Sequence, residues 1–202
     1  MEPMDRTFGL HHPTTLSNME ALAYIYYLTK RLDKSIPLYQ KSLDRRLERF
    51  GREEPGTLRT MTNLGVNYWS AGRIEEALPL LKEAYQAGEK HPEQQWTENA
   101  LLECYAQAGM KDEGGALVHA IVERTRLTVS ANSPALAREL ARLSRPLLRI
   151  ESFTDAQALL QECLEIREQA DPDSWLTFNT KSMLGGAHLG QKKFVEAEPL
   201  LE

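Results

Sequence analysis

Four arginines in the second half of the chain are the clearest sign of chemistry in the sequence. They follow one another at intervals of 4, 3 and 4 residues: Arg138, Arg142, Arg145 and Arg149. In a helix this spacing places all four on one face, and Glu139, the acid inside the run, is expected on a different face. Guanidinium groups in a row repel one another unless anions lie opposite. We therefore expect this face to receive carboxylates.

The alternative is an ordinary solvated helix face, which is what most charge runs are. In that case the arginines pair with acids of the same protein, either Glu103 or acids of a following segment such as Glu162 and Glu165. The sequence leaves both interpretations open.

The histidines indicate neither catalysis nor a metal. His11 and His12 match no zinc pattern, and His91, His119 and His188 lie far apart. No Ser/His/Asp or Cys/His arrangement can be proposed from their spacing. We therefore expect no enzyme activity and no cofactor.

Composition and cysteine use point to a cytoplasmic protein. Cys104 and Cys163 stand alone and are expected to be reduced, buried residues. The net charge of −5 argues against nonspecific binding to nucleic acid. The chain has no apolar run of about 18 residues that could span a membrane, and its start lacks the apolar core of a secretory signal.

An internal repeat positions these residues. Similar segments lie at 33–43, 75–85, 112–122, 154–164 and 195–201. Aligned on one small residue, they are spaced by 42, 37, 42 and 41 residues, at Ser35, Ala77, Gly114, Ala156 and Ala197. A proline precedes each repeat, at Pro13, Pro55, Pro92, Pro134 and Pro172. Proline suits the first turn of a helix, where its missing amide would be unbonded anyway.

Each repeat is predicted to form two helices. In the second repeat, Leu58, Met61, Leu64 and Tyr68 share one helix face, Gly72 ends that helix, and another amphipathic segment follows. Thr57, Ser133 and Asp171 are candidate N-caps. No segment alternates with period two for long enough to be a strand. The fold class is therefore all-α.

Small residues recur where the two helices of a pair are expected to cross. These residues are Ala23 with Ser35, Gly65 with Ala77, and Gly185 with Ala197. A glycine inside a helix costs about 1 kcal/mol relative to alanine, so its recurrence indicates a packing benefit.

The pattern Leu64-Gly65-x-x-Tyr68, followed by Ala77, resembles the tetratricopeptide repeat (TPR). It recurs closely in the first and fifth repeats and loosely at 101–114 and 143–156. The 42-residue spacing and connectors such as "FGREEPGTL" (50–58) resemble the kinesin light chain type. The resemblance implies a right-handed superhelical solenoid of about five stacked antiparallel helix pairs, the last pair incomplete. It implies a single array over 1–202, with units of approximately 13–51, 55–90, 92–127, 133–170 and 172–202.

Two positions depart from the family pattern. Pro146 falls inside a predicted helix, so we expect a kink there or a helix that ends near Arg145. Gly114 and Gly115 replace the usual alanine and are expected to loosen the third hairpin.

The resemblance also implies a binding scaffold whose first helices line a concave groove. Carried over position by position, the groove residues are Tyr24, Tyr27, Arg59, Asn63, Val66, Trp69, Trp96, Asn99, Glu103 and the four arginines, with Asn179, Ser182 and Gly186 from the last repeat. Tyr26, Tyr68 and Tyr105 are expected in the core. Trp69 and Trp96 fit the core and the groove equally well.

These observations predict a protein-protein interaction scaffold that binds a peptide or partner segment, as part of a larger multidomain protein. The peptide is expected to be acidic or to end in a carboxylate. The alternative is a structural or oligomerisation module that stacks end to end without a peptide ligand. Because Phe194, Leu200 and Leu201 lack a capping helix, we expect either a longer protein or ends that pack against another copy.

Overall fold

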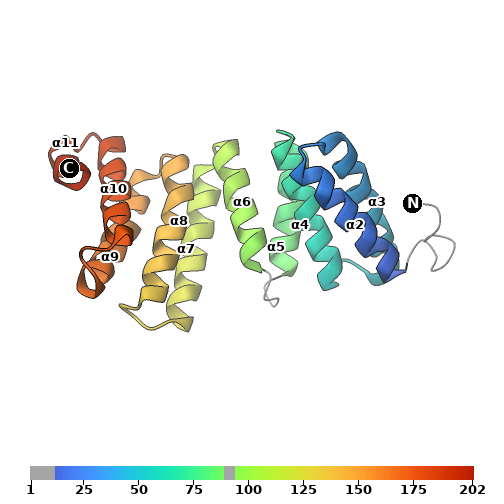
Figure 1. The fold of residues 1–202 in the computed structure, drawn as a ribbon, viewed down its shortest axis with the longest axis horizontal. Helices are drawn as coiled ribbons and strands as arrows, with labels where there is room; N and C mark the ends of the chain where they lie inside the picture. Colours follow the sequence, from blue (N-terminus) through green and yellow to red (C-terminus); the bar gives the residue numbers. More distant parts are fainter. Residues whose placement is uncertain (1–11, 89–93) are drawn as a thin grey trace. The chain divides into compact units, whose positions relative to one another are not determined.

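The computed structural model describes residues 12–88 and 94–202, which form helices and no strand (Figure 1). The predicted all-α class is therefore confirmed, and successive helices pair as the repeats predict. The helices are α2 (Pro13–Leu28), α3 (Leu32–Phe50), α4 (Pro55–Ser70), α5 (Ile74–Ala87), α6 (Gln94–Ala108), α7 (Lys111–Thr128), α8 (Pro134–Arg149), α9 (Phe153–Ala170), α10 (Trp175–Gly190) and α11 (Phe194–Leu201). None of these described helices is long and apolar enough to pass through a bilayer.

The chain divides into two compact units, Met1–Cys104 and Tyr105–Glu202, and each is described by itself. In the first unit, Gly65 and Ala77 lie where the two helices of their pair cross, as predicted. A Cβ on Gly65 would lie 2.7 Å from Cγ of Leu81 and 3.4 Å from the carbonyl oxygen of Ala77. In the second unit, a Cβ on Gly185 would lie 2.7 Å from Cγ of Leu201.

The first helix pair closes through a hydrogen bond instead of a glycine. The buried hydroxyl of Ser35 donates to the carbonyl of Ala23 at 2.7 Å. In the third pair, Gly114 is buried, and a Cβ there would lie 3.1 Å from Cδ1 of Ile150 and 3.6 Å from Cβ of Tyr105.

The two helices of each pair are joined by the same tight turn. One residue of each turn has a positive φ, between 58° and 74°: Lys30, Gly72, Gly109, Glu151 and Lys192. The next N–H donates to the carbonyl five residues earlier at 2.8 to 3.0 Å, and these carbonyls belong to Tyr26, Tyr68, Tyr105, Leu147 and His188. The shared turn supports the repeat alignment, and Gly72 follows the end of α4 as predicted.

The helix starts confirm some of the predicted caps and correct others. Pro13, Pro55 and Pro134 lie in the first turns of α2, α4 and α8. The N-cap of α8 is Ser133, as predicted. Thr57 and Asp171 are not N-caps, because Glu54 and Ser174 hold those positions and accept from the following backbone N–H groups. Pro172 lies in the turn before α10, and Pro92 lies outside the described residues.

Pro146 does not end α8 near Arg145. The helix continues to Arg149, and the carbonyl of Pro146 accepts from the N–H of Ile150 at 3.0 Å. Ser144 turns its hydroxyl back onto the carbonyl of Leu140 at 2.7 Å. Pro146 lies in the last turn of α8. Its missing amide therefore removes one hydrogen bond close to the end of the helix, and the helix tolerates this loss.

A buried polar cluster joins the first helix pair to the second. Oε1 of Glu20 accepts hydrogen bonds from Ser42 at 2.6 Å, Arg46 at 2.7 Å and Thr60 at 2.8 Å. Nη1 of Arg46 also lies 3.5 Å from the carboxylate of Glu54. These residues come from α2, α3 and α4 and from the cap of α4, so the cluster ties three helices together.

Candidate functional site

The four arginines lie on α8 opposite its leucines. Leu136, Leu140, Leu143 and Leu147 are buried. Arg138, Arg145 and Arg149 are exposed, and Arg142 is half-buried. We call these four arginines the arginine stripe.

Glu139 is not separated from the stripe, contrary to the expectation from the sequence. Its carboxylate accepts a hydrogen bond from Nε of Arg142 and lies 2.8 Å from Nη2 of the same residue. Residues three apart are neighbours on a helix surface, which explains the pairing. Part of the stripe's charge is therefore compensated inside α8.

Two of the other acids considered as internal partners, Glu162 and Glu165, contact other residues. Glu162 lies 2.7 Å from Arg126, and Glu165 accepts from Gln161 at 3.3 Å. Arg138 and Arg145 make no ion pair with any residue that the structure describes. The stripe thus presents two exposed guanidinium groups that can accept an external anion.

In the first unit, the predicted tyrosines form a pair on α2. The rings of Tyr24 and Tyr27 stack with centroids 6.3 Å apart and an interplanar angle of 21°. Tyr24 is 52% exposed, and Nζ of Lys30 lies 5.6 Å from the ring centre of Tyr27. The pair offers an exposed aromatic surface next to a cation.

The predicted residues of α4 differ in exposure. Arg59 is exposed, and Asn63 and Trp69 are half-buried. Val66 is buried at 3% exposure, so it cannot contact a ligand, and its placement in the groove was wrong. Nε1 of Trp69 is buried and has no hydrogen-bond partner among the described residues.

On α6, the three predicted residues follow one side of the helix. Trp96 is 51% exposed, and Asn99 and Glu103 are half-buried. Their spacing of three and four residues keeps them on one face. In the last repeat, Ser182 is exposed, and Asn179 and Gly186 are half-buried.

The core tyrosines are only partly as predicted. Tyr68 and Tyr105 are buried, at 5% and 6% exposure. Tyr26 is half-buried and lies under the guanidinium of Arg31, 4.7 Å from the ring centre. Tyr39, which the sequence analysis did not single out, is buried; burial and then the nearby Glu20 carboxylate raise its pKa above the usual range.

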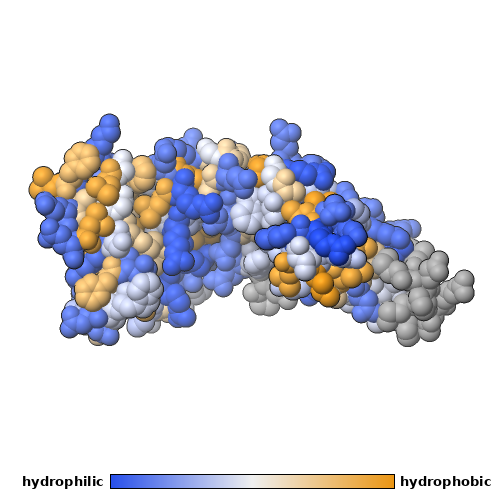
Figure 2. Space-filling view, turned by 45° about the horizontal axis from the view of Figure 1, so that its top comes forward, coloured by the Kyte–Doolittle hydropathy of each residue, from blue (hydrophilic) through white to orange (hydrophobic). Residues whose placement is uncertain are grey.

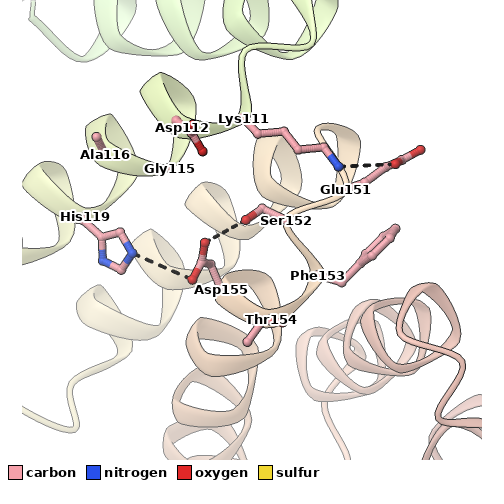
Figure 3. Close-up of a pocket in the computed structure, with 10 residues that line it drawn as sticks. All are labelled: Lys111, Asp112, Gly115, Ala116, His119, Glu151, Ser152, Phe153, Thr154 and Asp155. Carbon is pink, nitrogen blue, oxygen red and sulfur yellow. Dashed lines mark hydrogen bonds and ion pairs between the residues drawn. The ribbon is translucent and has the colours of Figure 1, made fainter.

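A surface pocket of about 430 Å³ in the second unit was not predicted (Figure 3). It lies between α7 and the start of α9, and Gly115 and Ala116 leave it open because their side chains are small. Ser152 donates to Asp155 at 2.7 Å, His119 lies 3.9 Å from the same carboxylate, and Lys111 lies 3.4 Å from Glu151 (Figure 3).

This grouping of Ser152, Asp155 and His119 is not arranged as a catalytic triad. An activated serine donates to a histidine, whereas here the hydroxyl of Ser152 donates to the carboxylate. Ser152 is the residue before α9, and Asp155 lies in its first turn. The contact joins two neighbouring side chains at the start of α9, and Ser152 makes no side-chain hydrogen bond that caps the helix.

Both cysteines are buried and free, as predicted. Burial raises the pKa of the Cys104 thiol to about 11 and raises that of Cys163 as well. The thiol of Cys163 donates to the carbonyl of Ala137 at 3.1 Å. Both groups are therefore protonated at neutral pH and are poor nucleophiles.

Hydrophobic side chains gather on α10 and α11. Figure 2 shows them at the end of the chain where these helices lie. Trp175 is 72% exposed, Phe194 64% and Val195 82%, and Leu201 is 47% exposed. Leu200 is half-buried.

Comparison with known proteins agrees with this architecture. Residues 12–90 match the tetratricopeptide repeat family. No curated protein matches the sequence significantly.

Solved structures share the fold over nearly the whole chain. Two of them contain nearly identical TPR-like repeats of a kinesin light chain from Podosopora anserina, and each is 20% identical to this chain. The match to the first has a TM-score of 0.80 and covers 94% of this chain and 93% of that one. The second is a variant with a single substitution; its match has a TM-score of 0.79 and covers 94% of this chain and 92% of that one. BtubC (BKLC) from P. vanneervenii is 16% identical, with a TM-score of 0.69, and the match covers 98% of this chain and 83% of that one.

Proposed function

Because the chain is built of tetratricopeptide repeats of the kinesin light chain type, we propose that it is a protein-protein interaction scaffold rather than an enzyme. The proposed ligand is an acidic segment of a partner protein, held on the exposed side of α8, the first helix of its repeat. The arginine stripe on α8 is its main contact. In the first unit, Tyr24, Tyr27 and Trp96 form a separate candidate contact surface.

The observation that carries this proposal is the exposure of Arg138 and Arg145 without an ion pair to any described residue. A guanidinium binds a carboxylate through two parallel hydrogen bonds, which gives it both strength and direction. Arg142, paired with Glu139, keeps the middle of the stripe ordered.

The environment of the cysteines supports a cytoplasmic location. Cys104 and Cys163 are both buried thiols, and neither forms a disulfide. The proposal requires no cofactor, no metal and no nucleic acid.

The test is a binding titration with fluorescent 12-residue peptides. One peptide alternates glutamate with leucine, and its matched control carries glutamine in place of glutamate. We expect only the acidic peptide to bind, and Arg145→Glu to weaken its binding at least tenfold, which corresponds to about 1.4 kcal/mol. Raising the salt concentration should weaken binding, since exposed charges are screened.

Lys41→Glu is the control for the charge change. Lys41 is exposed on α3, a second helix of a pair, and the substitution changes the net charge by the same amount. It should leave the affinity unchanged. Equal binding of both peptides, or an equal effect of both variants, would contradict the proposal.

A second candidate function is self-association through the apolar surface of α10 and α11. Its support is the exposure of Trp175, Phe194, Val195 and Leu201. Exposed apolar residues in a group mark contact surfaces. If this function holds, the mass measured by sedimentation should rise with concentration, and Val195→Glu should abolish the rise without affecting the acidic peptide.

A further inference from the structure

A polar site lies where the first helix pair packs against the second, and a related site lies where the fourth pair packs against the fifth. The two sites differ in their charged residues. In the first unit the site is complete. Arg46 is held by the carboxylate of Glu20 at 2.7 Å and lies 3.5 Å from the carboxylate of Glu54. Ser42 and Thr60 donate their hydroxyls to the same oxygen of Glu20.

The repeat alignment identifies the matching positions in the second unit. Arg46 follows Ser35 by eleven residues, and Arg167 follows Ala156 by eleven. Thr60 precedes Ala77 by seventeen residues, and Thr180 precedes Ala197 by seventeen. The arginine and the threonine are therefore present at both joints.

Both carboxylates are missing from the second joint. Glu20 precedes Ser35 by fifteen residues, and the residue fifteen before Ala156 is Ala141. Glu54 is the N-cap of α4, and the N-cap of α10 is Ser174. The site in the second unit thus has an arginine, Arg167, but lacks the two acids that bind the matching Arg46 in the first unit.

In place of the two carboxylates, Arg167 has neutral hydrogen-bond acceptors. Its Nη1 donates to the carbonyl of Leu176 at 2.7 Å and to the hydroxyl of Thr180 at 2.5 Å. It makes no ion pair with any residue in the described part of the chain. Neutral acceptors are weaker partners for a guanidinium than a carboxylate is, so the cation is incompletely satisfied.

A cavity of about 440 Å³ opens at this place. Arg138 and Arg167 both line it, and its apolar lining includes Ala137, Ile166 and Leu176. Ser174 also lines it, at the position where Glu54 extends a longer, charged side chain in the first unit. The cavity therefore combines an apolar wall with Arg138 and Arg167, neither of which makes an ion pair with a described residue. Ser174 is shorter than the matching Glu54 and leaves space in the cavity.

We propose that this cavity receives the side chain of a glutamate from a partner protein. Its carboxylate binds Arg167 and Arg138, and its methylene groups contact Ile166 and Leu176. The partner's acid thereby replaces the one that Glu54 supplies in the first unit. This proposal rests on the proposed function, because the partner is a protein segment. It concerns a different place, at the start of α8 and the end of α9, rather than the middle of the arginine stripe.

One acid of the chain also lines the cavity. Asp171 is exposed, and its backbone N–H donates to the carbonyl of Arg167 at 2.8 Å. Its carboxylate opposes the binding of a second one, so Asp171→Asn should raise the affinity of the site.

The probe is N-acetyl-glutamic acid methylamide, which carries a side-chain carboxylate and a blocked backbone. It is titrated into the whole ¹⁵N-labelled chain, and the Nε–H signal of Arg167 and the amides of Ser174 and Thr177 are followed by NMR. We expect saturable shifts with a Kd on the order of a millimolar, a reasonable affinity for so small a ligand. The glutamine analogue should cause no saturable shift.

Three variants locate the binding. Ser174→Glu supplies an internal carboxylate, as Glu54 does, and should reduce probe binding at least tenfold and raise Tm. Ser174→Ala keeps the space open and should bind the probe as the wild type does. Arg167→Gln should weaken binding at least tenfold, whereas Arg126→Gln on α7 should not.

The proposal is overturned if Ser174→Glu and Ser174→Ala bind the probe equally, or if the glutamine analogue binds as well as the acid. It is also overturned if N-acetyl-leucine, which has a free terminal carboxylate, shifts the same signals and the glutamate probe does not. The Ser174 variants decide the question even if Arg167→Gln fails to fold, because Glu54 shows that glutamate is tolerated at this cap position.

The probe separates this inference from the proposed function. Arg145 does not line the cavity, so Arg145→Glu should leave probe binding intact. If the acidic peptide fails to bind while the probe binds at Ser174, the stripe proposal falls and the carboxylate site stands. If the acidic peptide binds while the probe does not, the carboxylate site is ruled out and the scaffold function stands.

Discussion

Glu20 is a buried acid at the centre of the polar cluster of the first unit. Its carboxylate is buried and accepts from Ser42 and Arg46 of α3 and from Thr60 of α4. A Cβ on Gly56 would lie 2.4 Å from Nη1 of Arg46, so a larger residue there would displace the guanidinium. A buried charge without its partner is costly, and so neither member of the pair can be changed alone.

Glu20→Gln should therefore destabilise the protein. Glutamine keeps the shape of the side chain and removes its charge, which leaves Arg46 with Glu54 alone. We expect the free energy of unfolding to fall by about 3 kcal/mol, measured by urea denaturation at pH 7. Glu151→Gln removes an exposed partner of Lys111 and should cost less than about 1 kcal/mol. Equal losses from both would show that the buried cluster contributes nothing special.

Glu54 makes stability depend on pH. Burial alone would raise its pKa, but the N–H groups of Gly56 and Thr57, the Thr57 hydroxyl and Arg46 together hold the pKa below its usual value. The folded state thus prefers the carboxylate. This contribution is fully present above the unfolded pKa, about 4.3, and is lost as the pH falls through the lower, folded pKa.

The corresponding variant is Glu54→Gln. At pH 7 it should reduce the free energy of unfolding by about 1 kcal/mol, the usual worth of a helix cap. The difference from the wild type should shrink as the pH is lowered below about 4, when the wild-type carboxyl is protonated too. A difference that stays constant between pH 7 and pH 3 would contradict this explanation.

At the scale of helices, each pair is specified by one small residue and one tight turn. Gly65 and Gly185 lie in the same place in their repeats and face matching leucines, Leu81 and Leu201. Their role was predictable because repeats make a packing requirement visible in the sequence. The turn residues Lys30 and Glu151 were not predictable, since non-glycine residues with positive φ carry no clear sequence signal.

Gly65→Val tests the crossing of α4 and α5. Its Cβ would lie 2.7 Å from Cγ of the fully buried Leu81, so the helices must separate. We expect a loss of about 1 to 3 kcal/mol in thermal or urea unfolding. Gly186→Val is the control, because a Cβ at Gly186 has no atom within 4 Å, and it should change stability little. The packing account fails if both variants behave alike.

For the candidate site, the sequence predicted which residues are exposed better than it predicted their partners. The stripe follows from spacing alone, and three of its four arginines are exposed. The pair of Arg142 with Glu139 was missed because a glutamate three residues earlier was assigned to another face. The cavity at Arg167 depends on which acids the fold brings to the joint. It becomes visible only when Ala141 and Ser174 are compared with Glu20 and Glu54.

At the scale of the whole molecule, the repeats place similar helices in similar surroundings and vary their exposed side chains. The first unit offers aromatic side chains at Tyr24 and Trp96, and the second offers the arginine stripe and the cavity at Arg167. Repeat folds commonly bind partners in this way, with a constant framework and variable surface residues. The apolar surface of α10 and α11 provides the competing explanation, in which the chain associates with itself.

Hydrogen exchange of the whole chain, with and without a saturating amount of the alternating glutamate–leucine peptide, tests the central claim most directly. Binding to the stripe predicts that exchange slows mainly in α8 and that Arg145→Glu abolishes the slowing. If exchange slows instead in α10 and α11, and does so equally without peptide as the protein concentration rises, the scaffold proposal is wrong and self-association replaces it.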